Sequence, residues 1–246
     1  MTTSRTVLIT GGGGGIGRGI AQAFLDQGDR VVLADVNADA VAAVAAEIGA
    51  ASVALDITDP AAVTGAVAAV AEEHGPIDVL VNNAGILSVH GAITELAAEA
   101  YRSIVDVNIV GTFNATQAVA NHMIAAGTRG TIVNISSIGG RQPTPGMGAY
   151  ESSKAAVDSL TRWAAIELAG HGIRVNAVAP GPVLTPMLQM GMPEGSPART
   201  AWEARVPLGV LAAVEDVAPA VVFLAGPGAG HITGVSLPVD GGQLLA

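Results

Sequence analysis

Tyr150, Lys154 and Ser137 are the residues of this chain whose types and spacing best suit proton transfer. Tyr150 and Lys154 are four residues apart, and Ser137 lies thirteen positions before the tyrosine. Residues four apart on a helix share one face, so the Lys154 ammonium is expected to lie near the Tyr150 oxygen. A free tyrosine titrates near pH ~10, and a nearby positive charge favours the phenolate that would act as a base. Ser137 would then orient the substrate oxygen.

A glycine-rich turn near the N-terminus predicts a site for a dinucleotide. Residues 6–10 form a short apolar run typical of a strand, and a helical pattern follows the intervening Gly11 to Gly15, Ile16 and Gly17. Glycines let a ligand approach the backbone, and the amides that open the next helix suit a pyrophosphate. A flexible linker would not be bracketed so closely by a strand and a helix.

Asp35 predicts NAD rather than NADP as the cofactor. It ends the second expected strand, residues 30–34, about twenty residues beyond the glycine turn, where a carboxylate binds the adenosine ribose hydroxyls. The same carboxylate would repel a 2′-phosphate, and Gly14 and Val36 offer no charge to neutralise one. Arg18 is the alternative partner for that phosphate, but its position on the helix after the turn favours a surface or interface role.

Length and composition predict one soluble domain. The chain has 246 residues, of which 50% are hydrophobic, enough for the core of a single α/β unit. A net charge of −10 and scattered basic residues argue against a nucleic-acid partner. The mean hydropathy of +0.51 comes largely from alanine, and no uninterrupted apolar run reaches the ~18 residues of a membrane span.

Targeting and redox features predict a cytoplasmic location. The first five residues lead directly into an expected strand, which leaves no room for a secretory signal peptide. The chain has no cysteine, so it has no disulfide, no thiol nucleophile and no thiolate metal ligand.

Strand patterns alternate with alanine-rich helical patterns along the chain. Further strands are expected at residues 51–55, 77–81, 130–135 and 173–178, with helices at residues 37–48, 60–74 and 97–126. This alternation predicts a single-domain doubly wound Rossmann fold, a parallel sheet with helices on both faces. The candidate functional groups follow the carboxyl ends of strands, where open α/β sheets bind their ligands.

Together these residues resemble the short-chain dehydrogenase/reductase family over nearly the whole chain. Its glycine motif falls on Thr10 to Gly17, its Asn-Asn-Ala-Gly motif on Asn82 to Gly85, and its Tyr-x-x-x-Lys pair on Tyr150 and Lys154. The family spacing selects Ser137 rather than Ser136 as the catalytic serine. The resemblance implies these NAD-binding residues: Gly11, Gly15, Ile16, Gly17, Asp35, Asp56, Ile57, Asn83, Ala84, Gly85, Tyr150, Lys154, Pro180, Gly181, Val183 and Thr185.

The resemblance also implies the chemistry, which is hydride transfer between a nicotinamide and a secondary alcohol or ketone without a metal. Asn108, Ser137, Tyr150 and Lys154 would be the catalytic residues. Tyr150 would transfer the proton, Lys154 would lower the tyrosine pKa, and Asn108 would position a water that links the lysine to solvent. The family further implies a homotetramer. Taken singly these residues have ordinary readings, such as a helix charge or a turn hydroxyl, which the full set outweighs.

The segment at about residues 186–207 is expected to form a substrate lid. It is rich in glycine and proline and carries apolar Met187, Leu188, Met190, Met192 and Trp202. The alternative is that these side chains pack against a neighbouring subunit. His90 and Arg141 are further candidates for the cleft. Arg199 and Arg205 come only late in the segment, which favours an uncharged substrate with an apolar portion.

Two other functions stay open. The first is a reductase of 3-oxoacyl thioesters, which Asp35 disfavours because biosynthetic reductions usually use NADPH. The second is a nucleotide-binding regulator that kept the fold and lost the chemistry. The intact catalytic residues argue against it.

Overall fold

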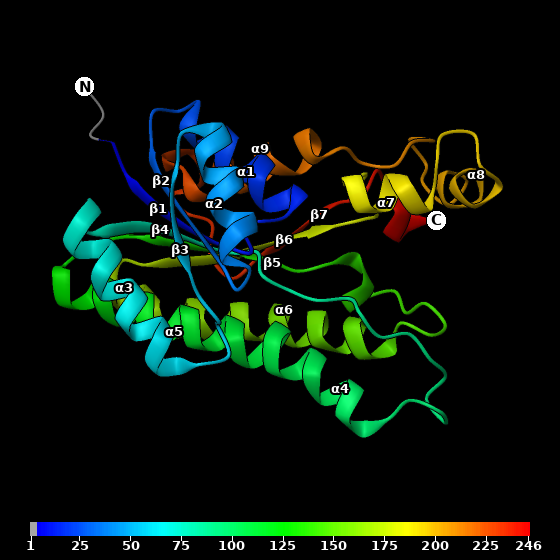
Figure 1. Cartoon of the computed structure of the whole chain (residues 1–246), viewed down its shortest axis with the longest axis horizontal. Coiled ribbons are helices and arrows are strands. Elements are labelled where there is room, and N and C mark those ends of the chain that lie inside the picture. Colours follow the sequence, from blue (N-terminus) through cyan, green and yellow to red (C-terminus); the bar gives the residue numbers. More distant parts are fainter. Residues whose placement is uncertain (1–3) are drawn as a thin grey trace.

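A seven-stranded parallel sheet forms the centre of the molecule (Figure 1). The computed structural model describes residues 4–246, except for the side chain of Met187. The strands are β1 (Thr6–Thr10), β2 (Arg30–Asp35), β3 (Ala51–Ala54), β4 (Ile77–Asn82), β5 (Thr131–Ile135), β6 (Arg174–Pro180) and β7 (Ser236–Val239). Their order in the sheet is β3-β2-β1-β4-β5-β6-β7. The order reverses between β1 and β4, the point at which such sheets bind ligands.

Helices cover both faces of this sheet (Figure 1). One face carries α1 (Gly15–Leu25), α2 (Ala38–Ile48) and α9 (Val214–Ala225). The other carries α3 (Pro60–His74), α5 (Thr112–Ala126) and α6 (Gly148–Leu168), with α4 (Ala98–Val105) packed against α6. Two short helices, α7 (Pro186–Gly191) and α8 (Pro197–Glu203), lie near the C-terminus in Figure 1. Short helical turns complete the chain: η1 (Asp106–Gly111, a π turn), η2 (Ile138–Gly140), η3 (Ala169–His171), η4 (Pro227–Ala229) and η5 (Gln243–Leu245).

Side-chain caps set the boundaries of two of the helices. The Asn37 carboxamide accepts a hydrogen bond from the Ala40 amide at 3.0 Å at the start of α2. Asp59 caps α3 in the same way, and Pro60 follows at the first helical position. Gly49 ends α2 in the left-handed conformation, with φ of 76°. These signals account for the agreement with the helices predicted at residues 37–48 and 60–74.

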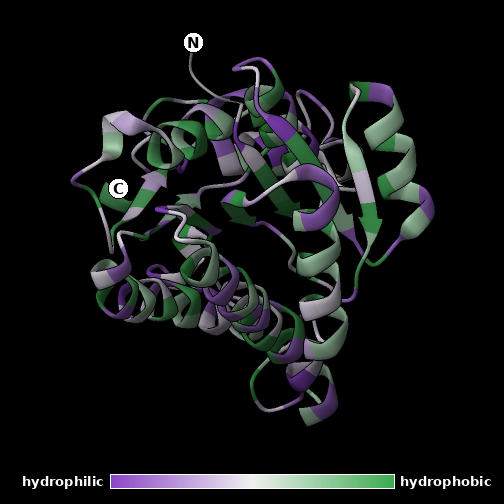
Figure 2. Ribbon diagram, turned by 90° about the vertical axis from the view of Figure 1, so that its left-hand side faces the viewer, coloured by the Kyte–Doolittle hydropathy of each residue, from purple (hydrophilic) through white to green (hydrophobic). Residues whose placement is uncertain are grey.

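Two apolar layers hold the helices to the sheet. Phe24 of α1 and Val221 of α9 are fully buried on one face, and Leu80 of β4 and Met123 of α5 are fully buried on the other. Figure 2 shows hydrophobic residues concentrated along the strands and mixed polarity on the helices. A close-packed core of this kind tolerates little shift, so it fixes where the carboxyl ends of the strands lie.

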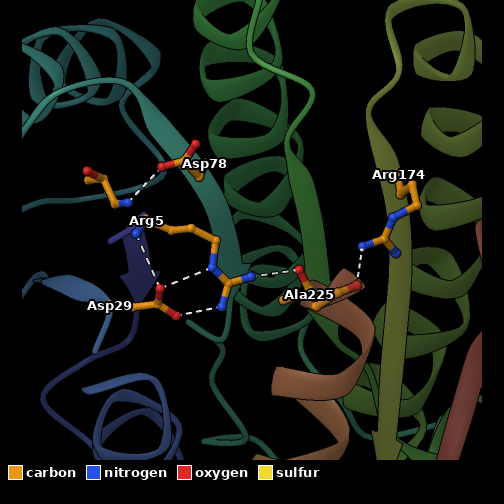
Figure 3. Close-up of polar contacts among 7 residues, drawn as sticks. Arg5, Asp29, Asp78, Arg174 and Ala225 are labelled. Carbon is orange, nitrogen blue, oxygen red and sulfur yellow. Dashed lines mark hydrogen bonds and ion pairs between the residues drawn. The ribbon is translucent and has the colours of Figure 1, made fainter. Parts of the chain in front are cut away.

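Arginines tie the opposite end of the sheet to the end of α9 (Figure 3). Arg5 donates to the Asp29 carboxylate and, at 2.9 Å, to the Ala225 carbonyl. Arg174 donates to the Leu224 carbonyl at 2.8 Å. The last turn of α9 has no basic residue of its own, so these two side chains supply the positive charge that its final carbonyls favour.

The predicted doubly wound fold is confirmed, with two differences in detail. β7 was not predicted, because it is only four residues long and contains Pro238, which lacks the amide that a ladder uses. The helix predicted at residues 97–126 is divided by the π turn η1 into α4 and α5. Within residues 4–246, no helix combines the length and the apolar character required to cross a bilayer.

Candidate active site

The glycine turn between β1 and α1 leaves the first amides of α1 without a capping side chain. Gly14 occupies the N-cap, and the first turn of α1 holds no acidic residue. Gly11 has a positive φ of 68°, and a Cβ there would lie 2.7 Å from the Ala84 Cα. A Cβ on Gly17 would lie 2.3 Å from the Gly11 carbonyl oxygen, so both positions require glycine. The turn therefore offers N–H groups to an anion.

Asn83 holds this turn against the loop that follows β4. Its amide nitrogen Nδ2 donates to the carbonyls of Thr10 and Gly11 at 3.1 and 2.8 Å. In return, the Thr10 hydroxyl accepts from the backbone amides of Asn83 and Ala84 at 3.2 and 3.1 Å. The Asn-Asn-Ala-Gly segment thus fixes the shape of the glycine turn.

A cleft of about 730 Å³ runs along this edge of the sheet. It is lined by these predicted cofactor residues: Gly11, Gly15, Ile16, Gly17, Asp35, Asp56, Ile57, Asn83, Ala84, Gly85 and Thr185. Asp35 accepts hydrogen bonds from the Gly13 and Asn37 amides, both at 3.0 Å, which orient its carboxylate at the end of β2. Asp56 accepts from the Thr58 amide and hydroxyl at 2.9 and 2.7 Å.

Arg18 does not line the cleft. Its guanidinium pairs with Glu47 of α2 at 2.5 Å, on the exposed surface. The hydrogen bond and charge of Glu47 raise the pKa of Arg18 above its usual value. Arg18 therefore has the surface role that the sequence favours.

The cleft fits an adenine dinucleotide. The uncapped amides of α1 suit a pyrophosphate, and the fixed Asp35 carboxylate accepts hydrogen bonds from neighbouring hydroxyls. Pro180, Gly181 and Val183 line an adjoining cavity instead of this cleft, and Thr185 lines both. A nicotinamide reaching Pro180 would therefore enter the adjoining cavity.

Ser137, Tyr150 and Lys154 line that second cavity, which has a volume of about 500 Å³. Ser137 follows β5 and caps η2, where its hydroxyl accepts from the Gly139 amide at 3.1 Å. Tyr150 and Lys154 share one face of α6, as predicted. The Lys154 ammonium lies 5.5 Å from the centre of the Tyr150 ring and donates to the Ile135 carbonyl at 2.8 Å.

The electrostatics of the pair differ from the sequence prediction. Burial raises the pKa of the Tyr150 phenol above its usual value, which the Ser137 hydroxyl opposes and the Glu151 charge reinforces. Burial also lowers the pKa of Lys154 to about 8, and the Asp158 charge opposes this. The lowering of the tyrosine pKa that was expected from Lys154 is not found, because burial of the phenol raises this pKa and the ammonium lies 5.5 Å from the ring centre. The Tyr150 phenol therefore keeps its proton near neutral pH.

Asn108 is fully buried in the π turn and lines neither cavity. Its side chain accepts from the Ile86 amide at 2.8 Å and donates to the Ile86 carbonyl and the Ser153 hydroxyl, both at 3.0 Å. A Cβ on Gly85 would lie 3.3 Å from both the Asn108 Oδ1 and the Lys154 Nζ. Asn108 thus supports the wall beside Lys154, and π turns are frequent at such sites.

The predicted lid contributes only part of its apolar residues to the cavity. Leu188, Met192 and Trp202 line it. Met190 is 79% exposed on the outer side of α7, and the side chain of Met187 lies outside the described part of the chain. The correction follows from helix geometry, since residues two apart face different directions.

The sequence analysis named His90 and Arg141 as further candidates for the cavity, and the structure brings one of them there. His90 lines the cavity, whereas Arg141 does not. Arg141 lies 3.6 Å from Asp158 and donates to the Ser236 carbonyl at 2.7 Å. Arg199 pairs with Glu203 at 2.8 Å.

The sequence analysis missed these polar residues of the cavity: Gln142, Thr144, Glu151 and Gln243. Glu151 could have been found from the sequence, because it follows Tyr150 directly and lies in the first turn of α6. Arg205, which was expected only at the far end of the lid, also lines the cavity. Arg205 stacks on Trp202 with 4.5 Å between the guanidinium and the ring centre. Gln243 belongs to the C-terminal turn η5, so only the folded chain brings it to the cavity.

The chain is similar over nearly its whole length to known oxidoreductases. A family model described as enoyl-(acyl carrier protein) reductase matches residues 12–243. A sorbitol dehydrogenase from Cereibacter sphaeroides is 40% identical over 253 residues, which cover 98% of each chain. The solved structure of ElxO with NADP bound has a TM-score of 0.93 and 34% identity, covering 99% of this chain and 100% of that one. An NAD⁺-bound xylitol dehydrogenase has a TM-score of 0.91 and 31% identity, covering 98% and 100%.

The glycine turn, the Asn83 contacts and the Tyr150 and Lys154 pair are therefore found in a chain that matches both the family model and full-length relatives. Both nicotinamide coenzymes occur among the structural neighbours. The chain belongs to the short-chain dehydrogenase/reductase family and is an oxidoreductase of that type.

Proposed function

We propose that this enzyme interconverts a secondary alcohol and a ketone with NAD(H), using Tyr150 as the general acid and base. The observation that carries the proposal is the convergence of Ser137, Tyr150 and Lys154 on one cavity that shares walls with the glycine cleft. The sorbitol dehydrogenase relative supports an alcohol substrate.

The side chains divide the proton chemistry among them. In ketone reduction Tyr150 donates its phenol proton to the carbonyl oxygen, which the Ser137 hydroxyl holds. The Lys154 ammonium stabilises the phenolate that this step leaves behind. Bound NADH supplies the hydride, and NAD⁺ accepts it in the reverse direction. Asn108 acts as a positioning residue, since its hydrogen bonds to Ile86 and Ser153 support the wall beside Lys154.

The choice of NAD depends on the end of β2. Asp35 presents a carboxylate that two backbone amides orient, and a 2′-phosphate beside it would be repelled. The nearest candidate cation, Arg18, is engaged by Glu47. The nicotinamide end is held by Pro180, Gly181, Val183 and Thr185, in the cavity that also holds the reacting alcohol.

The enzyme is a cytoplasmic homotetramer in this proposal. Exposed aromatic and aliphatic side chains on α5 and α6 support an interface, since Trp163 is 50% and Ile166 79% exposed. The Trp163 ring stacks on Phe113 with 6.1 Å between centres, which joins the two helices into one apolar surface. Symmetric pairing of such surfaces is the commonest way to build an oligomer.

Tyr150→Phe is expected to lower kcat by about 10²- to 10⁴-fold, because it removes the proton donor and leaves the ring in place. The affinity for NADH, measured by fluorescence titration, should change less than about twofold. Tyr101→Phe is the matched control, since Tyr101 contacts Ser152 on the surface. Substantial activity of Tyr150→Phe on every alcohol and ketone tried would refute the proton role.

Assays of the wild-type enzyme with alcohols, simple ketones and 3-oxoacyl thioesters distinguish the two alternative functions, acyl-thioester reduction and nucleotide-dependent regulation. Turnover of 3-oxoacyl thioesters, with no activity on simple ketones, would assign the chain to acyl-thioester reduction. NADH binding without any turnover would assign it to nucleotide-dependent regulation.

Asp35→Ala is expected to narrow the preference for NAD over NADP by about tenfold or more, since it removes the charge that opposes the 2′-phosphate. The measurement is kcat/KM for each coenzyme with one alcohol. Asp39→Ala on the exposed surface of α2 should leave the ratio unchanged. Equal kcat/KM values for the two coenzymes in the unmodified enzyme would show that the role given to Asp35 is wrong.

Ketone reduction is expected to decline as the pH rises through about 8, the pKa of Lys154. Below that pH the ammonium is present, and it is lost as the pH rises. Tyr150, with its raised pKa, stays protonated over the same window. The profile of kcat/KM for NADH reports these groups in the free enzyme. Lys154→Arg should remove the decline, because arginine does not titrate there, and a flat wild-type profile between about pH 6.5 and 9.5 would contradict the assignment.

Light scattering at micromolar concentration is expected to give the mass of four chains of 24.3 kDa. Trp163→Ser and Ile166→Ser together should shift the distribution toward smaller species, because they remove the apolar surface. A monomer in the unmodified protein would rule out the tetramer.

A further inference from the structure

The cavity lining includes three side chains with free hydrogen-bond acceptor capacity, and Glu151 is the charged one. Glu151 is only 5% exposed and lines the cavity next to Tyr150. Both of its carboxylate oxygens accept from the same donor, the Thr144 amide, at 2.9 and 2.8 Å. Across residues 4–246, the lysines, arginines and histidines that form ion pairs do so with other acids.

This arrangement leaves acceptor capacity unused at a buried charge. A carboxylate has about four lone-pair sites, and a single N–H occupies only part of them. A buried anion without a counter-charge is costly unless hydrogen bonds satisfy it. Glu151 therefore favours a ligand that brings hydrogen-bond donors into the cavity.

Two glutamines of the same cavity add further acceptors. The Oε1 atoms of Gln142 and Gln243 are buried and have no hydrogen-bond partner among the described residues. Gln142 lies in the loop that Glu151 fixes through Thr144. Gln243 is 3% exposed, and its Oε1 lies 3.6 Å from where a Cβ on Gly181 would be. An unsatisfied buried carbonyl oxygen favours the same kind of donor.

We infer that Glu151 is a specificity-determining residue that accepts a hydrogen bond from a second hydroxyl group of the substrate. This inference rests on the proposed alcohol and ketone chemistry and narrows its substrate class to diols and polyols. The reacting hydroxyl binds Ser137 and Tyr150, and the further hydroxyl binds Glu151, with Gln142 and Gln243 as additional acceptors. The carbon skeleton packs beneath Leu188, Met192 and Trp202.

The charge of Glu151 favours a neutral donor over an anionic group. A substrate carboxylate placed against Glu151 would be repelled. A hydroxyl group at that position avoids the repulsion and still donates. Hydroxy acids whose carboxylate would occupy the Glu151 position are therefore disfavoured relative to neutral diols of the same size.

The test compares cyclohexanol with the positional isomers of cyclohexanediol, which share one ring and differ in the second hydroxyl. A hydrogen bond to a charged acceptor predicts a kcat/KM that is about tenfold or more higher for the preferred diol. Glu151→Gln keeps the shape and an acceptor for the Thr144 amide but removes the charge. This substitution should reduce the preference for the diol by about tenfold. Any effect on proton transfer by Tyr150 would change the kcat/KM of both alcohols by the same factor.

The diagnostic quantity is the ratio of the two kcat/KM values, because a change in the Tyr150 pKa or in folding affects both alcohols alike. Gln243→Leu and Gln142→Leu should each lower the ratio by a smaller factor with the KM for NAD unchanged. Glu72→Gln, on the exposed face of α3, should leave it unchanged. Calorimetric Kd values of both alcohols for the Tyr150→Phe protein with NAD give the same comparison without turnover.

A diol-to-monoalcohol ratio near one in the wild type, or an unchanged ratio in Glu151→Gln, would overturn the inference. An altered KM for NAD in Gln243→Leu with an unchanged ratio would assign that amide to the cofactor. Absence of turnover with all alcohols, together with a preserved diol preference in the Kd values, would refute the proposed reaction while supporting the role of Glu151.

Discussion

The contact between Asn83 and the glycine turn is the interaction on which the rest of the site depends. β1 and β4 are neighbours at the point where the strand order reverses, and their following loops diverge there. The Asn83 side chain bridges the divergence by donating to Thr10 and Gly11. Gly85 of the same loop lies against Asn108 and Lys154. The hydrogen bonds from the Asn83 side chain to the glycine turn therefore align the cofactor cleft with the residues proposed for proton transfer.

The active site keeps two buried charges that a core selected for stability alone would lack. Lys154 is 5% exposed and is bound by one carbonyl, and Glu151 is equally buried and is bound by one amide. Replacing such groups by apolar residues is often neutral or stabilising in proteins. Their presence in one cavity therefore indicates chemistry, because incomplete partners within the chain leave both groups able to interact with a ligand.

Local sequence features account for the parts of the site that were predicted correctly. Lys154 follows Tyr150 by one helical turn, and Ser137 lies two residues after the end of the buried strand β5, so local geometry places these groups at one edge of the sheet. The family resemblance added Asn108, whose side chain proved to be behind the cavity wall. The glycine run and Asp35 are likewise placed by the strands that precede them.

The predictions that failed depend on packing between distant segments. The raised pKa of Tyr150 results mainly from burial, and the tyrosine-lysine spacing in the sequence does not report how deeply the phenol is buried. Gln243 enters the cavity through a C-terminal turn that Asp240 holds with bonds to the Gly242 and Leu244 amides. Met190 is exposed because of its position on α7. The sequence of this segment, which is rich in glycine and proline, does not show where that helix begins and ends.

Cofactor choice and substrate choice reside on separate elements of this structure. Asp35 is at the end of β2, whereas the groups proposed to contact the substrate come from the segment after β5, the first turn of α6, the lid and η5. The cleft and the cavity share a wall, which is formed by Ile16, Asn83, Gly85, Ile86 and Thr185. A substitution at Glu151 or Gln243 is therefore expected to alter the selection of alcohols without reaching the adenosine end. This separation gives a physical reason why relatives with the same fold bind either nicotinamide coenzyme, since a change at the end of β2 leaves the proton-transfer residues in place.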